Sequence, residues 1–112
     1  MTITFIYILE AHATDEWYVA SINEEIPQHR TLRDRYNAAT IFLDKYPLHE
    51  DIIFLLDNEG NDFNSTYSSW PFRYWLIDSM GLVELKMVPI EDKVSLSDLI
   101  SWLEAKYAMM LN

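Results

Sequence analysis

The residues most able to do chemistry lie in one short segment near the N-terminus, FIYILEAHATDEW, residues 5–17. Its apolar run ends in Glu10 and His12, and Asp15 and Glu16 follow closely. Alternate residues of a strand point to the same face, so Glu10 and His12 could form a proton-transfer pair that tunes a nucleophile. Because the chain contains no cysteine, we favour a hydrogen-bonded structural pair at the strand end.

Two further patterns could suggest metal sites, and neither fits one. The spacing of His12, His29 and His49 matches no short zinc motif, and no cysteine is present to assist. The segment DNEGND, residues 57–62, has glycine at its fourth position, whereas an EF-hand loop needs it at the sixth. We therefore predict locally hydrogen-bonded histidines, a solvated turn at residues 57–62, no metal and no cofactor.

The composition is typical of one acidic domain over residues 1–112. Eighteen acidic and eight basic residues give a formal net charge of −10, which repels nucleic acid and anionic membranes and favours basic protein partners. No apolar run is long enough to span a membrane, and the N-terminus lacks the basic start of a secretory signal. We predict a cytoplasmic protein that binds neither nucleic acid nor membrane.

Apolar patterns predict where the strands and helices lie. Residues 2–9 form a continuous apolar run typical of a strand covered on both faces, and residues 13–30 form a long polar loop. Thr31 can cap a helix that Pro47 ends, with Asp34 at the capping-box position. The inner face of this helix is predicted to consist of Leu32, Tyr36, Ala39, Leu43 and Tyr46.

The remaining half of the chain predicts a second strand, a short helix, a hairpin and a last helix. These elements lie at residues 52–56, at about residues 61–68, at residues 73–77 and 82–88, and from Ser95 onward. Gly81 in the connection favours an antiparallel hairpin, and Trp75 and Trp102 are expected in the core. The order indicates an α/β fold with a mixed sheet.

Three segments, YILEAHATDEW, IPQHRTLRDRYNAA and WPFRYWLID, resemble the iodothyronine deiodinase family and its bacterial redoxin-like relatives. The resemblance runs from about residue 3 to residue 106, and its most specific parts are the runs EAH-x-x-D-x-W and H-x-x-L-x-x-R. It implies a thioredoxin-like α/β fold with a peroxiredoxin-like insertion, in which helices flank a mixed sheet of about four strands.

The resemblance also implies roles for individual residues. In that family an acid and a histidine handle protons beside a catalytic selenocysteine or cysteine, and by position these are Glu10 and His12, with Tyr7 beside them. The loop histidine that helps to hold the iodothyronine corresponds to His29, and Pro71 falls where thioredoxin-like folds keep a cis-proline. The candidate ligand-binding residues are thus Tyr7, His29, Pro71 and Arg73.

The chain departs from the family pattern in three ways. Leu9 stands where the family has a first glutamate, and Phe72 stands where many members have an acid after the proline. The first βα unit, which carries the selenocysteine or cysteine, is missing from this sequence. Trp17 and Trp70 would flank the place of that helix, and with Phe72 they are predicted to form a partner surface. Arg73 is expected to pair locally with an acid.

The missing strand would lie between the strands predicted at residues 2–9 and 73–77. Its loss leaves two facing edges of unpaired N–H and C=O groups, each of which costs roughly 1–3 kcal/mol if it is buried. The two strands could pair directly, a second copy could supply a strand in a homodimer, or another protein could add one by β-augmentation. We favour the homodimer.

Three functions remain open at this point. The preferred one is a non-catalytic deiodinase-like protein that acts through protein–protein binding. The second is part of a thiol or selenol redox enzyme that an upstream segment or a partner completes. The third is an acidic inhibitor, for example phage-encoded, whose charge mimics nucleic acid.

Overall fold

The computed structural model describes residues 1–19, 25–70, 72–87 and 96–111, and the chain divides into two compact units. The N-terminal unit is Met1–Pro71 and the C-terminal unit is Phe72–Asn112. The elements in chain order are β1 (Thr4–Tyr7), α1 (Leu32–Lys45), β2 (Ile53–Leu56), α2 (Asp62–Tyr67), β3 (Trp75–Ile77), β4 (Val83–Lys86) and α3 (Ser97–Leu111). This order confirms the α/β class, while the single domain over residues 1–112 stays a prediction.

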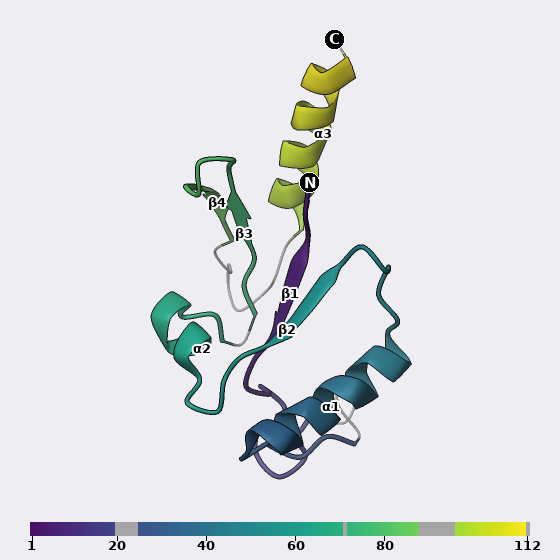
Figure 1. Ribbon diagram of the computed structural model, residues 1–112, viewed down its shortest axis with the longest axis vertical. Helices are drawn as coiled ribbons and strands as arrows, with labels where there is room; N and C mark the ends of the chain where they lie inside the picture. The colour runs from purple at the N-terminus through teal and green to yellow at the C-terminus, as the bar shows by residue number, and fades with distance from the viewer. Residues whose placement is uncertain (20–24, 71, 88–95, 112) are drawn as a thin grey trace. The chain divides into compact units, whose positions relative to one another are not determined.

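In the N-terminal unit, β1 and β2 lie side by side as a parallel pair (Figure 1). Thr4 is opposite Ile53, and Tyr7 is opposite Leu56. The Asp57 N–H donates to the Tyr7 carbonyl at 2.9 Å and closes the ladder. The sheet therefore ends at Tyr7, two residues earlier than the apolar run in the sequence predicts.

Glu10 and His12 lie beyond the end of β1, in an irregular segment. The expectation that they alternate along a strand is therefore wrong. The physical reason is the side-chain amide of Gln28, which occupies both backbone groups of Glu10. Gln28 Oε1 accepts from the Glu10 N–H at 3.3 Å, and Gln28 Nε2 donates to the Glu10 carbonyl at 2.9 Å. A backbone that is bonded to a side chain in this way is not available to a neighbouring strand.

The start of α1 follows the predicted capping chemistry. Thr31 Oγ1 accepts a hydrogen bond from the Asp34 N–H at 3.1 Å, which satisfies one of the free donors in the first turn. Asp34 reaches back and accepts from the Arg30 N–H at 3.3 Å, one residue before the cap. The helix ends at Lys45, ahead of Pro47, as predicted.

The inner face of α1 differs from the predicted apolar stripe. Its buried residues are Arg35, Ala38 and Ala39, which lie three or four positions apart and so share one face. Tyr36, which was predicted to point inward, is 64% exposed. The buried face of α1 differs from the predicted apolar stripe because it includes the charged residue Arg35. A prediction from hydrophobic periodicity assigns only apolar residues to the buried face.

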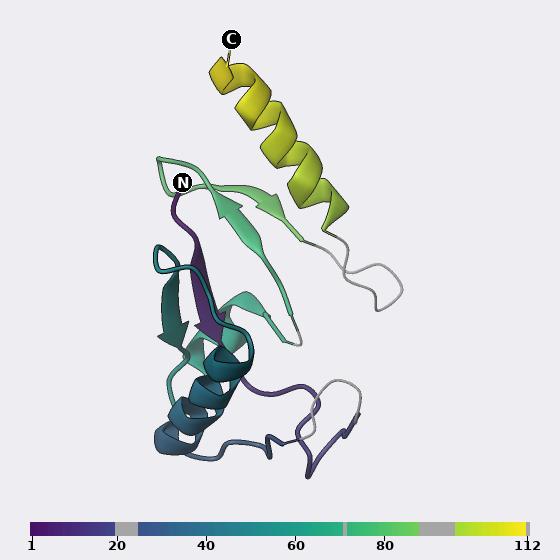
Figure 2. The ribbon, with the colours of Figure 1, turned by 90° about the vertical axis from the view of Figure 1, so that its right-hand side faces the viewer.

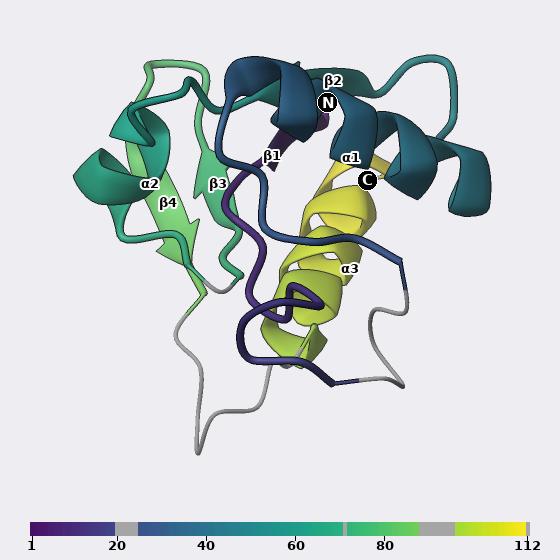
Figure 3. The same cartoon turned by 90° about the horizontal axis from the view of Figure 1, so that it is seen from below.

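Within the N-terminal unit α1 lies beside the β1–β2 pair (Figures 1 and 3), and aromatic side chains join the two. The ring of Phe42 lies 5.9 Å from that of Tyr7 and 6.2 Å from that of Phe54, measured between centroids. Alternate residues of β2 point the other way, and there Ile53 and Leu55 are 46% and 49% exposed. Within the N-terminal unit, therefore, α1 covers one face of the sheet, and cover on the second face stays a prediction.

The loop between β2 and α2 is organised by a buried carboxylate. Asp57 is 4% exposed, and it accepts hydrogen bonds from the backbone N–H groups of Asn58 at 2.9 Å, Phe63 at 2.9 Å and Asn64 at 3.0 Å. It thereby caps α2 from outside the helix, because Asn61 at the cap position makes no side-chain hydrogen bond to the helix. The prediction of a solvated turn is wrong at this residue.

In the C-terminal unit, β3 and β4 form the predicted antiparallel hairpin (Figure 2). Asp78 Oδ1 accepts from the N–H groups of Met80 at 2.8 Å and Leu82 at 2.9 Å, which holds the turn. Gly81 has a φ of 82°, a left-handed conformation that glycine adopts without steric cost. The helix predicted at the C-terminus is α3, and its predicted cap, Ser95, lies outside the described residues.

The described strands form two two-stranded sheets, β1 with β2 and β3 with β4. Each sheet lies within its own unit, so the expected single mixed sheet of about four strands stays a prediction. In the described ranges β1 pairs with β2 and β3 pairs with β4, and the three outcomes expected for the missing strand stay open. Among the same residues, no helix combines the length and the apolarity needed to cross a membrane.

Candidate functional site

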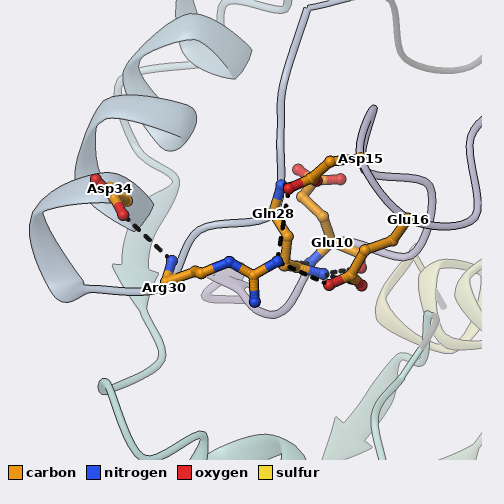
Figure 4. Close-up of polar contacts among 6 residues, drawn as sticks. All are labelled: Glu10, Asp15, Glu16, Gln28, Arg30 and Asp34. Atoms are coloured by element: carbon orange, nitrogen blue, oxygen red, sulfur yellow. Dashed lines mark hydrogen bonds and ion pairs between the residues drawn. The ribbon is translucent and has the colours of Figure 1, made fainter.

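Polar side chains gather in the N-terminal unit where the segment after β1 meets the segment before α1 (Figure 4). An open cleft of about 290 Å³ lies beside them. It is lined by Leu9, Glu16, Gln28, His29, Arg30, Thr31, Arg35, Glu59 and Asn61. Acidic, basic and amide groups meet here, as in a site that orients a polar ligand.

Gln28 holds this region together. It is 8% exposed, and besides its two bonds to Glu10 it donates its backbone N–H to Asp15 Oδ1 at 2.8 Å. Its amide Nε2 also donates to Glu16 Oε2 at 3.1 Å. One residue, through its backbone N–H and its side-chain amide, therefore fixes the backbone of Glu10 and the carboxylates of Asp15 and Glu16, as Figure 4 shows.

The two acids at the rim, Asp15 and Glu16, share Arg30. The Arg30 guanidinium lies 3.5 Å from each carboxylate, and all three side chains are largely exposed. The pKa of Asp15 is lowered, first by the hydrogen bond from the Gln28 backbone and to a smaller extent by Arg30. Exposed pairs of this kind contribute little to stability, so their effect here is to shape the charge at the mouth of the cleft.

Tyr7 and Glu10 form a direct hydrogen bond, in which the phenolic hydroxyl donates to Glu10 Oε1. The pKa of Tyr7 is raised, first by burial of the ring and then by the Glu10 carboxylate. Tyr7 therefore stays protonated and remains a donor throughout the physiological range. Of the three residues that the resemblance places beside the reactive atom, Tyr7 and Glu10 thus contact each other, with Tyr7 coming from β1 and Glu10 from the segment after it.

His12 has a separate partner. Its Nδ1 lies 3.1 Å from the carbonyl oxygen of Trp17, and the two rings meet edge-on at 4.5 Å between centroids. A carbonyl oxygen only accepts, so Nδ1 of His12 carries the proton in this contact. Trp17 itself is 62% exposed. Glu10 therefore bonds to Tyr7, whereas His12 contacts Trp17.

His29 is the most deeply buried of the predicted ligand-binding side chains that the structure describes, at 5% exposed. Its Nδ1 accepts a hydrogen bond from Arg35 Nε at 2.9 Å, and its ring lies 5.8 Å from that of Tyr7. The pKa of His29 is lowered to about 4, first by burial and then by the Arg35 charge, against the opposite effects of Asp34, the Ile8 backbone and Glu16. The imidazole is therefore neutral at pH 7.

The remaining predicted residues belong to the C-terminal unit or to other segments of the N-terminal unit, or lie outside the described residues. Arg73 donates to the carbonyl of Phe72 at 2.6 Å, where an acid was expected as its partner. Phe72 and Trp70 are 44% and 38% exposed, and Pro71 lies outside the described residues, as does its predicted cis peptide. His49 is exposed and contacts Asp51 at 3.5 Å.

In the part of the chain that the structure describes, no group of three or more histidine, aspartate and glutamate side chains could hold a metal ion. Two residues that organise the site, Gln28 and Arg35, were not singled out from the sequence, and Asp57 was considered only as part of a possible calcium loop at residues 57–62. The signal for Arg35 was its position, since it shares a helix face with Ala38, Ala39 and Phe42. Gln28 and Asp57 lie in irregular segments, where periodicity carries no information.

Fold and site together define a small α/β protein in which a tyrosine–glutamate pair and a buried histidine–arginine pair lie beside a polar cleft, in a chain without a thiol. The sequence matches the family model described as iodothyronine deiodinase over residues 2–107. The chain therefore belongs to the iodothyronine deiodinase family.

Individual relatives agree with this assignment. Thyroxine 5-deiodinase of Ovis aries is 34% identical over 99 residues, which cover 88% of this chain and 32% of the relative. The thyroxine 5-deiodinase of Homo sapiens is likewise 34% identical over 99 residues, with 31% of its length covered. The type I iodothyronine deiodinase of Xenopus laevis is 36% identical over 78 residues, 70% of this chain and 29% of the relative. The chain thus spans about a third of the length of these relatives.

Proposed function

We propose that this chain is a deiodinase-like protein of thioredoxin-like fold that acts by binding a protein partner and does not itself reduce a substrate. The observation that carries the proposal is a deiodinase-family sequence in which none of the 112 residues is a cysteine. Thiol and selenol reductions need a sulfur or selenium nucleophile. Tyr7, Glu10 and His29 can hold protons or bind a ligand, but they cannot replace that atom.

Exposed aromatic side chains support a role in protein–protein contact. Trp17 and Tyr18 are 62% and 49% exposed in the N-terminal unit, and Trp70 is 38% exposed there. Phe72, in the C-terminal unit, is 44% exposed. Aromatic side chains are enriched among the residues that dominate binding energy at interfaces. The net charge of −10 favours a basic partner surface, and a cytoplasmic location is part of the same proposal.

The outer edge of β1 offers a route for self-association. The bonds from Ile53 to the Ile3 carbonyl and from Asp57 to the Tyr7 carbonyl direct the odd-numbered residues of β1 toward β2. The backbone groups of Thr4 and Ile6 therefore point to the opposite edge. A strand from a second copy, or from another protein, would satisfy them by edge pairing.

Sedimentation velocity over a range of concentrations tests the homodimer. We expect the wild type to show a concentration-dependent dimer, Thr4→Pro to be monomeric with an unchanged circular dichroism spectrum, and Thr4→Ala to behave as the wild type. Proline removes the outward N–H, whereas alanine keeps it. A wild type that is monomeric at every concentration would remove the homodimer, and a Thr4→Pro variant that still dimerises would remove this edge as its site.

A second experiment tests the absence of turnover. Purified protein is incubated with a dithiol reductant and an iodinated phenol, and released iodide is measured against a sample without protein. We expect no difference between the two. Iodide release that depends on the purified chain would refute the proposal directly.

The second candidate function is the proton-handling part of a redox enzyme whose thiol or selenol comes from an upstream segment or a partner chain. The observation in its favour is the assembled Tyr7–Glu10 hydrogen bond beside the neutral His29. The DNA directly upstream of the Met1 codon decides this: an in-frame cysteine or UGA codon between strand-like and helix-like sequence supports it. In the completed protein, Glu10→Gln would then lower the rate of iodide release.

A further inference from the structure

The guanidinium group of Arg35 is held by four acceptors from two segments of the N-terminal unit, the segment before α1 and the loop between β2 and α2. It is 3% exposed, and its Nε donates to His29 Nδ1 at 2.9 Å. One terminal nitrogen donates to the carbonyls of Asp57 at 3.0 Å and Asn58 at 2.6 Å, and the other donates to Asn61 Oδ1 at 2.5 Å. These contacts on three different nitrogens fix the plane of the guanidinium and leave it no other orientation.

That geometry determines where the proton of His29 lies. An arginine side chain keeps all five of its N–H donors in proteins, so the Nε that faces His29 always carries hydrogen. The imidazole nitrogen opposite must then offer its lone pair, and a neutral imidazole has only one proton to place. We propose that Arg35 is a positioning residue that fixes His29 as the neutral tautomer with its proton on Nε2.

The titratable and charged groups around His29 come from three segments. Arg35 and Asp34 lie on α1, Tyr7 lies on β1, and Glu16 lies in the segment after β1. The charges of Asp34 and Glu16 raise the pKa of His29, whereas burial and the Arg35 charge lower it. Burial and Arg35 have the larger effect, so the pKa is lowered overall. Because the ring stays neutral, the tautomer set by Arg35 persists across the physiological pH range.

The consequence is a fixed chemical role for His29. Its Nδ1 lone pair is occupied, so His29 cannot accept a proton there as a general base. Its Nε2 is buried and makes no well-formed hydrogen bond within the described residues, although the Ile8 backbone favours a proton on the ring. If the cleft binds a ligand, as the proposed function allows, His29 acts on it only by donating, and a group that presents an oxygen acceptor is favoured.

Nitrogen-15 NMR of the imidazole rings tests the tautomer without any partner or ligand. The chain has three histidines, and the signals of His29 are assigned by their loss in His29→Gln. In the wild type at pH 7 we expect one protonated nitrogen, Nε2, and one unprotonated nitrogen, Nδ1, with the Nε2–H form in roughly tenfold excess or more. A wild type with the proton on Nδ1, or with both tautomers in comparable amounts, would overturn the inference without any variant.

Two variants separate the hydrogen bond from the charge, and a third is the control. Arg35→Met removes both, so we expect mixed tautomers and a pKa of His29 above its wild-type value. Arg35→Lys keeps the charge but lacks the planar group, so the pKa stays low while the tautomer preference weakens. Arg33→Met changes an exposed arginine of the same helix and is expected to leave both readouts unchanged. An Arg35→Met protein that folds and keeps the wild-type tautomer would show that Arg35 is structural only.

Failure of this inference and failure of the proposed function are distinguishable. The NMR signature requires only the folded chain, whereas the binding proposal is tested by association and by iodide release. If His29 shows the expected tautomer in a protein that never dimerises, the inference about Arg35 still stands. If the protein dimerises but His29 shows mixed tautomers, the binding proposal still stands.

Discussion

Replacing Asp57 by asparagine is expected to destabilise the N-terminal unit by about 1–4 kcal/mol. Asparagine has nearly the same shape, so the change removes an acceptor and a charge with little change in volume. Asp57 is 4% exposed, and solvent therefore has little access to replace what is lost. Marginal stability makes this a large effect, since a domain of this size is stable by about 5–15 kcal/mol.

The magnitude follows from the three bonds of the carboxylate. Oδ1 accepts from Asn58 and Phe63, and Oδ2 accepts from Asn64. If the amide oxygen replaces Oδ1, the amide nitrogen faces the Asn64 N–H, and that donor loses its acceptor at a cost of about 1–3 kcal/mol. Loss of the negative charge at the start of α2 adds about 0.3–1 kcal/mol.

Urea denaturation followed by circular dichroism measures the change in unfolding free energy, and hydrogen exchange at the Asn64 amide locates it. We expect faster exchange at this amide in Asp57→Asn, by roughly tenfold for each 1.4 kcal/mol lost. Asp51→Asn is the matched control, because its side chain is 87% exposed. A change below about 0.5 kcal/mol in Asp57→Asn, equal to that in the control, would refute the capping role.

Two further predictions concern α1 and its surroundings. The pKa of His29 is about 4 in the folded chain and 6.5 ordinarily, so the unfolded chain binds more protons between these values. The stability from this group is therefore complete above about pH 6.5 and is lost as the pH falls toward 4, by up to about 3 kcal/mol at 1.36 kcal/mol per pH unit. Urea titrations of the wild type and His29→Gln measure it as a difference in slope over that window, and identical slopes would contradict the buried neutral histidine. Thr31→Ala is expected to cost about 1 kcal/mol through loss of the helix cap, as measured by thermal or urea unfolding. Thr40→Ala, within the same helix, should be neutral or slightly stabilising, and an equal loss in both variants would argue against a specific cap.

The sequence predicted the elements of the fold well, because the signals for them are local. Thr31 and Pro47 mark the two ends of α1 by capping and by the missing N–H of proline, and Gly81 marks the hairpin turn through its left-handed conformation. The apolar runs located β1 and β2, although β1 ends at Tyr7 because its next residues are bonded to a side chain. These features depend on a few neighbouring residues and so can be read without a structure.

Family membership was also visible in the sequence, since the runs around His12 and His29 carry it and the family comparison confirms it. The candidate site was predicted only in part. Tyr7, Glu10 and His29 do lie together in the N-terminal unit, whereas the contacts of His12 lead to Trp17. The partner surface, the homodimer and the location remain predictions.

Only the tertiary structure determined which charged groups are buried. Arg35 lies on the core face because His29 and the carbonyls and side chains of the loop after β2 accept hydrogen bonds from its guanidinium group. The sequence of α1 alone does not predict these acceptors, because they lie in other segments. Asp57 and Gln28 are buried for the same reason, since each bonds backbone groups that lie several residues to many residues away in sequence. A charge or an amide can leave water only when all its partners are already in place. Residue types and local spacing therefore determined the elements and the family, and the meeting of distant segments determined the chemistry of the site.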